Sequence, residues 1–156
     1  MVNALRLWRL CRAVHAADTF AGEGPFRYGG RWSPPRVAVV YCAESRSLAA
    51  MEVLVHHIGS DTFRLSSWVV IPAEVPEAMI EQPARVPDSW RALPPVWPVQ
   101  DFGAAWARER RSVALRVPSA VVLGEFNYLL NPAHPDFKRV KLGKPESFSF
   151  EPRLGA

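Results

Sequence analysis

Apolar residues in this chain occur in short segments, and the segments between them are rich in glycine and proline. The segment 5–11, LRLWRLC, alternates apolar with basic residues, which is typical of a strand with one buried face. Two segments have a helical pattern instead: 46–58, followed by Gly59 as a natural helix end, and 101–110, with Asp101 as its N-cap. Further strands are expected at 37–42, 63–71, 111–124 (interrupted at Pro118) and in ESFSF near the end.

Strands thus predominate, with two helices between them, and this order predicts an α+β fold. The length of 156 residues is that of one ordinary domain, and 49% apolar residues are enough for one core, so we expect a single compact domain over 1–156. The segments 18–36, 72–98 and 127–137 are expected to be irregular. The first is long enough to suggest a functional loop, and the tryptophans of the second favour packing over a flexible linker.

No apolar run approaches the ~20 residues that cross a membrane, and the start, MVNALRLWRLCRA, lacks the pattern of a signal peptide. We therefore expect a cytoplasmic protein that does not enter a membrane. Cys11 and Cys42 stand in no metal-ligand spacing. They are expected to be buried, inert thiols of a reducing compartment, with a disulfide between them as the less favoured alternative.

The formal net charge of +4 favours an anionic partner, which includes phosphates, an acidic protein and nucleic acid. Basic residues cluster only at Arg108–Arg111 and Lys138–Lys144, and such clusters are usually solvated surfaces. The histidines show no metal-ligand spacing, and neither a GxGxxG nor a Walker A segment is present. No metal site is therefore expected.

Glu52 is the most informative single residue. It lies four residues after Leu48 and three before Val55, which places it on the expected apolar stripe of its helix, formed by Leu48, Met51, Val55 and Ile58. A carboxylate is costly to bury unless it is paired. Glu52 is therefore a functional carboxylate, a structural partner of an arginine, or a helix-edge residue that reaches solvent.

Arg31 and Tyr41 are candidates from the segments before that helix. The glycines of GGRW permit a sharp turn and close approach of a ligand, so Arg31 suits a bidentate phosphate contact; alternatively, it pairs with Glu52 and only holds the loop. Tyr41 ends a buried strand, where a tyrosine either fills the core or stacks on a flat ligand ring. Ser119 alone carries almost no signal, because no GxSxG segment surrounds it.

Together, these segments resemble the signature of the RES domain family, which is named for an arginine, a glutamate and a serine. The matching pieces are GGRW, VVY, a glutamate eleven residues after that tyrosine, VPS and NYLLNPAHP. With the opening LRLWRL, the resemblance covers nearly the whole chain. The corresponding residues are Arg31, Tyr41, Glu52 and Ser119. The family usually has asparagine after GGRW, where this chain has Ser33.

The resemblance implies a mixed sheet like that of ADP-ribosyltransferases, with NAD⁺ as substrate and no further cofactor. It implies cleavage of the nicotinamide–ribose bond, with water, inorganic phosphate or a protein side chain receiving the ADP-ribose. It also implies a toxin that pairs with an Xre-like antitoxin, including higher-order toxin–antitoxin complexes. An enzyme of this kind needs a carboxylate where cationic character develops on the ribose.

The resemblance also assigns expected roles to the residues. Glu52 would stabilise the ribose cation, Arg31 would bind the pyrophosphate or orient the ribose, and Tyr41 would stack near the nicotinamide. Ser119 would hydrogen-bond the substrate or position Glu52. Further lining residues are expected at three positions: Arg9, Tyr28 and Asn127.

Two other functions are compatible with the sequence. The basic charge and the six tryptophans permit a ribonuclease or nucleic-acid-binding module, although no nucleic-acid motif is present and the basic residues form no obvious stripe. A non-catalytic interaction protein is the other alternative. The complete set of arginine, tyrosine, glutamate and serine argues against it, and direct nucleic-acid binding is not expected.

Overall fold

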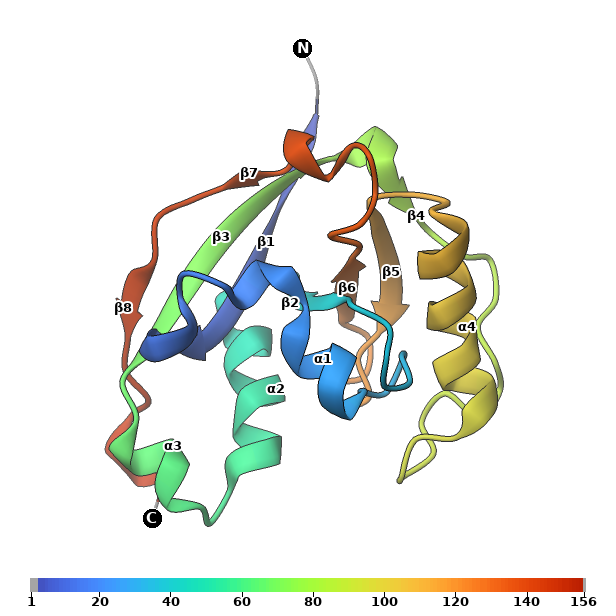
Figure 1. Cartoon of the computed structure of the whole chain (residues 1–156). Coiled ribbons are helices and arrows are strands. Elements are labelled where there is room, and N and C mark those ends of the chain that lie inside the picture. Colours follow the sequence, from blue (N-terminus) through green and yellow to red (C-terminus); the bar gives the residue numbers. More distant parts are fainter. Residues whose placement is uncertain (1–2, 156) are drawn as a thin grey trace.

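The computed structural model describes residues 3–155, which fold into one mixed sheet with helices against it (Figure 1). The strand order is β4-β5-β6-β2-β1-β3-β7, and β8 also pairs with β3. Among the strands of residues 3–155, β4 and β5 are parallel and the other pairs are antiparallel. The strands are β1 (Ala4–Arg12), β2 (Val40–Ala43), β3 (Trp68–Pro76), β4 (Ile80–Glu81), β5 (Ala114–Pro118), β6 (Phe126–Leu130), β7 (Lys141–Leu142) and β8 (Glu146–Phe148).

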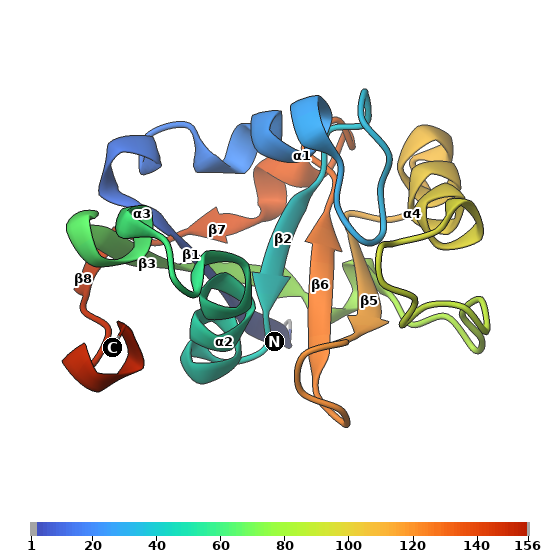
Figure 2. The ribbon, with the colours of Figure 1, turned by 90° about the horizontal axis from the view of Figure 1, so that it is seen from below.

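Two longer helices pack on the same face of the sheet. Below α2 lie Leu10, Ala43 and Val70, and below α4 lie Leu115, Val117 and Leu129. The central strands β2 and β6 run between these two helices (Figure 2). The other face is covered by Phe20, Phe137 and Val140. The α-helices are α1 (Glu23–Tyr28), α2 (Arg46–His57), α3 (Asp61–Leu65) and α4 (Trp97–Glu109), and short 3₁₀ turns occur at Ala13–His15, Thr19–Ala21, Glu77–Met79, Phe137–Arg139 and Pro152–Gly155.

The α+β class is confirmed, as are the first strand and the helix after residue 45. Ser45 caps that helix by accepting a hydrogen bond from Leu48 N, and Gly59 follows its end with a φ of +80°. Both cysteines are buried free thiols, as expected. Among residues 3–155, no group of acidic, histidine or cysteine side chains is arranged to hold a metal ion, and no helix is long and apolar enough to cross a membrane.

Several expected boundaries are wrong. The strand expected at 63–71 begins only at Trp68, because Ser60 caps a short helix by accepting from Phe63 N. The helix expected at 101–110 begins at Trp97, with proline in its first turn, so Asp101 lies inside it and is no cap. The expected loop 18–36 contains α1, and the strand expected at 37–42 begins only at residue 40. The strand region expected at 111–124 ends at residue 118, and the segment 127–137, expected to be rich in turns, begins within β6.

Of the apolar stripe expected on α2, Leu48 is buried as expected and the other members are not. Met51, Val55 and Ile58 are exposed, whereas Leu48, Ala49 and Leu54 are buried. Leu48 and Ala49 pack on β1 and β2, and Leu54 turns toward the C-terminal phenylalanines at 148 and 150. The helix is therefore rotated relative to the expectation, because it packs against the sheet on one side and the tail on another.

Candidate functional site

Glu52 lies at the edge of the face that α2 turns to the sheet, and two donors hold one of its carboxylate oxygens. Ser119 Oγ donates to Glu52 Oε1 at 2.8 Å, and Asn127 Nδ2 donates to the same oxygen at 2.7 Å. Hydrogen bonds to a charged acceptor are the stronger kind, so these contacts fix the orientation of the carboxylate. No described residue forms an ion pair with Glu52, and its Oε2 makes no hydrogen bond within residues 3–155.

Ser119 is itself oriented by the backbone that follows it. Its side chain is fully buried just after β5, and its Oγ accepts hydrogen bonds from Val121 N at 3.1 Å and Val122 N at 3.0 Å. A hydroxyl has one proton, and with both N–H groups pointing at the oxygen that proton is directed to Glu52. The serine is therefore arranged to position the carboxylate.

Arg31 is the second residue of a tight turn, Gly30–Ser33, that Gly30 N closes by donating to Ser33 O at 2.8 Å. Its Nη1 donates to the backbone oxygens of Trp90 at 2.9 Å and Ala92 at 2.8 Å. The edge formed by Nε and Nη2 makes no hydrogen bond with residues 3–155. That edge is the one that binds an oxyanion with two parallel hydrogen bonds.

The alternative in which Arg31 pairs with Glu52 is therefore not observed. Arg31 forms no ion pair with any carboxylate in the described part of the chain, and two backbone carbonyls only partly balance its charge. A half-buried guanidinium that has carbonyl partners on one side and none on the other keeps much of its attraction for an anion.

Sheet register brings these two groups of residues together. Tyr41 is opposite Leu129 and Ala43 is opposite Asn127, so Tyr41 and Asn127 lie on the same face as diagonal neighbours, roughly 7 Å apart. Tyr41 contacts the Arg31 turn: its hydroxyl accepts from Trp32 N at 3.1 Å and shares a 2.8 Å hydrogen bond with Ser33 Oγ. The face between α2 and α4 thus carries both the oriented carboxylate and the Arg31 turn.

Arg9 and Tyr28 are not brought to these residues in the same way. Arg9 projects from the same side of β1 as Leu7 and Cys11, which is the face opposite Asn127. There, Arg9 Nε donates to Thr19 Oγ1 at 2.9 Å and Arg9 Nη1 donates to Tyr41 O at 3.2 Å. Tyr28 ends α1 with 81% of its surface exposed. Their predicted roles as lining residues remain predictions.

The residues that support the Arg31 turn were not predicted from the sequence. Ser33 is fully buried, Trp90 and Ala92 supply carbonyls, and Gln100 Nε2 donates to Gly30 O at 3.0 Å. The dense tryptophans of 72–98 were a signal for packing in that segment. Every residue has a backbone carbonyl, however, so residue types cannot show which carbonyls accept hydrogen bonds from Arg31.

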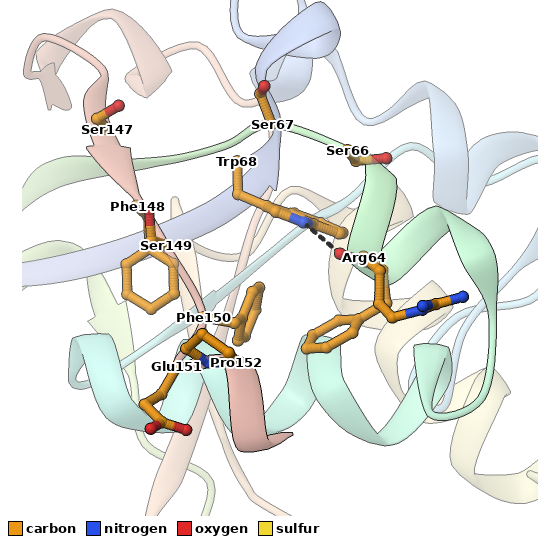
Figure 3. A pocket seen from close by; sticks show the side chains of 11 residues that line it. Arg64, Ser66, Ser67, Trp68, Ser147, Phe148, Ser149, Phe150, Glu151 and Pro152 are labelled. Atoms are coloured by element: carbon orange, nitrogen blue, oxygen red, sulfur yellow. Dashed lines mark hydrogen bonds between the residues drawn. The ribbon is translucent and has the colours of Figure 1, made fainter. Parts of the chain in front are cut away.

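One cavity in the structure lies away from these residues. It measures about 460 Å³ between α3 and the C-terminal tail, and Phe150 and Trp68 are among the residues that line it (Figure 3). The Phe150 ring packs against Trp68 and Phe63. None of the candidate residues lines this cavity. Because hydrogen bonding and burial single out the Glu52 and Arg31 region, we place the candidate site there rather than in this cavity.

Comparisons with known proteins agree with the family resemblance seen in the sequence. A protein named "Prs ADP-ribosylating toxin" from Sphingobium sp. (strain YBL2) is 38% identical over 153 residues, which cover 94% of each chain. A "Toxin Res" from Yersinia enterocolitica is 38% identical over 151 residues, or 96% of this chain and 99% of that one.

The fold has a solved counterpart in the crystal structure of the M. tuberculosis MbcT-MbcA toxin-antitoxin complex. One chain of it superposes with a TM-score of 0.71 over 96% of this chain and 86% of its own length, at 17% identity. That identity is low, so the likeness concerns the fold. The RES domain matches residues 6–151. With this match and two relatives that align along nearly its full length, the chain belongs to the RES domain family.

Proposed function

We propose that this protein is the toxin of a toxin–antitoxin pair and that it cleaves NAD⁺ at the bond between nicotinamide and ribose. The observation that carries the proposal is the carboxylate of Glu52, which Ser119 and Asn127 hold by Oε1 while Oε2 makes no hydrogen bond within residues 3–155. The name "Prs ADP-ribosylating toxin" of a relative supports chemistry on an ADP-ribosyl donor.

Cleavage of this bond does not need an acid to protonate the leaving group. The C1′–N bond breaks with its electron pair going to nicotinamide, which is cationic in NAD⁺ and leaves as a neutral molecule. Positive charge then develops on C1′ and the ring oxygen of the ribose. One carboxylate stabilises that charge, where ordinary glycosidases need a second carboxyl group to protonate the leaving oxygen.

The free edge of Arg31 suits the pyrophosphate of the same substrate. A guanidinium edge donates two parallel hydrogen bonds to phosphate oxygens, and Nη1 is already anchored to the carbonyls of Trp90 and Ala92. The ADP-ribosyl group then passes to an acceptor: water, inorganic phosphate or a side chain of a target protein. In each case a nucleophilic atom bonds to C1′. Water or a protonated side chain then also loses a proton, whereas an anionic phosphate oxygen has none to lose.

The partner in this proposal is an antitoxin of Xre-like type. The structural counterpart is a toxin-antitoxin complex, which supports a protein partner for the same fold. The net charge of +4 and the partly unbalanced Arg31 favour a partner that presents carboxylates.

The deciding experiment incubates the purified protein with NAD⁺, with and without inorganic phosphate, and measures free nicotinamide. Glu52→Gln should lower the rate by roughly 10²–10³, because the amide oxygen can still accept from Ser119 and Asn127 while the negative charge is lost. Glu74→Gln is the matched control, since Glu74 forms an exposed ion pair with Arg6. Unchanged NAD⁺ with the wild-type protein, or full turnover in Glu52→Gln, would contradict the proposal.

A further inference from the structure

The hydroxyl of Tyr41 is hydrogen-bonded within the protein, which a role in stacking alone would not require. Its hydroxyl accepts a hydrogen bond from Trp32 N and shares another with Ser33 Oγ, and both of these partner residues are buried. Its ring lies directly against Gly30: a Cβ at that position would stand 2.6 Å from the Tyr41 hydroxyl and 2.9 Å from the adjoining ring carbon. The phenol therefore points into the turn that carries Arg31.

The same turn is held from its other sides. On α4, Gln100 donates to Gly30 O, and Gly103 lies so close that a Cβ there would be 1.8 Å from Trp32 O. The Trp32 ring stacks on Trp90 with centroids 6.5 Å apart, next to the carbonyls that accept from Arg31. The turn therefore has fixed supports, and the Tyr41 hydroxyl is the one that the central sheet supplies.

We propose that Tyr41 acts as a positioning residue through its hydroxyl, which together with Ser33 fixes the Arg31 turn so that the guanidinium edge meets the pyrophosphate of NAD⁺. This inference rests on the proposed function. It differs from a stacking role for Tyr41, in which the ring would be the important part. It also gives Ser33 a task, since its hydroxyl has the Tyr41 hydroxyl as its partner.

The two roles separate in Tyr41→Phe, which keeps the ring and removes the oxygen. Without that oxygen, Trp32 N and Ser33 Oγ lose a partner in a buried place, and the turn is free to rearrange. Positioning predicts that KM for NAD⁺ rises about tenfold with a smaller change in kcat, whereas stacking predicts no change. Ser33→Ala should give a weaker effect in the same direction, because Trp32 N keeps its acceptor.

The test is a double-mutant cycle with Arg31. Tyr41→Phe, Arg31→Ala and the double variant are compared by KM and kcat for nicotinamide release. If the hydroxyl acts through Arg31, Tyr41→Phe has no further effect on KM once Arg31 is alanine. Tyr128→Phe is the matched control, because Tyr128 is a buried tyrosine on the neighbouring strand that faces the other side of the sheet.

A second measurement does not depend on NAD⁺ turnover. The Nε–H signal of Arg31 in the NMR spectrum, assigned by its loss in Arg31→Lys, should shift or broaden in Tyr41→Phe and not in Tyr128→Phe. An unchanged KM or an unchanged Arg31 signal in Tyr41→Phe overturns the inference, as does a full effect of Tyr41→Phe in the Arg31→Ala background. If the wild-type protein releases no nicotinamide, the proposed function fails, and the Arg31 signal still decides whether the hydroxyl positions the turn.

Discussion

At the scale of single residues, the candidate site depends on a few side chains that hydrogen bonds to the backbone hold in place. Ser119 donates to Glu52 while backbone N–H groups occupy its oxygen, and Arg31 is anchored by carbonyls on one side only. In both cases the protein satisfies one part of a polar group and leaves another part without a protein partner among residues 3–155. Such an arrangement orients a group without neutralising it.

Asn127 offers a test of that orientation. Asn127→Ala removes one of the two donors to Glu52 Oε1 and leaves Ser119 in place, so the carboxylate gains freedom to rotate. We expect kcat for nicotinamide release to fall roughly tenfold to a hundredfold, because a hydrogen bond to a charged group contributes about 1.5–3 kcal/mol. The measurement is kcat beside the unfolding midpoint in urea. Full activity at unchanged stability would show that Asn127 does not position Glu52.

Tyr41 predicts a pH dependence of stability. Burial raises the pKa of Tyr41 from 10.0 to about 12, although the hydrogen bonds from Ser33 and Trp32 and the charge of Arg31 oppose the change. The folded state thus keeps the proton that the unfolded chain loses first. The contribution of this proton to the free energy of unfolding is complete below pH 10 and is lost as the pH rises from 10 to about 12.

The free energy of unfolding should therefore fall more steeply over this range in the wild-type protein than in Tyr41→Phe. The expected difference is about 2 kcal/mol, measured by urea unfolding at several pH values. Burial also raises the pKa of Cys42 to about 12, but Cys42 titrates in both proteins and cancels in the comparison. Parallel stability curves for the two proteins would mean that the hydroxyl of Tyr41 is not buried as described.

At the scale of elements, the sequence predicted the strands and helices that have a clear local sequence pattern. The first strand follows from alternation, and α2 follows from its helical pattern and from Gly59 at its end. The orientation of α2 did not follow, because both its sheet-facing side and its tail-facing side are apolar, and helical periodicity cannot choose between them. Likewise, Glu52, Arg31 and Ser119 were identified by their motifs, whereas Ser33 and the carbonyls near Arg31 depend on contacts distant in sequence.

The orientation of α2 can be tested by stability. Leu48 is 1% exposed and Met51 is 43% exposed, although both belong to the stripe expected from the sequence. Leu48→Ala should cost about 2–5 kcal/mol of unfolding free energy, as for other buried leucines, while Met51→Ala should stay within about 0.5 kcal/mol. Urea denaturation measures both. Equal losses in the two variants would show that α2 is rotated from the position described.

At the scale of the whole molecule, several exposed arginines form ion pairs with carboxylates, whereas Arg31 does not within residues 3–155. Surface arginines pair with carboxylates at several places, including Arg6 with Glu74, Arg46 with Glu146, and Arg111 with Glu81. Such exposed pairs contribute little to stability, but they reduce the field at the surface. Arg31 has two backbone carbonyls and no carboxylate as partners within residues 3–155, so its positive charge remains available to an anion at the candidate site.

This distribution of charge leads to a prediction about the antitoxin. If the protein consumes NAD⁺, the host must restrain it, and we expect an Xre-like antitoxin encoded beside it to place a carboxylate against the Arg31 edge. Binding should abolish nicotinamide release, and raising the ionic strength should weaken the complex, because partly exposed charge pairs are screened by salt. Arg31→Ala should weaken binding of the antitoxin measured by calorimetry, whereas Arg6→Ala, in an exposed ion pair between β1 and β3, should leave it unchanged. A complex that still consumes NAD⁺ at the full rate would show that the antitoxin binds away from the site.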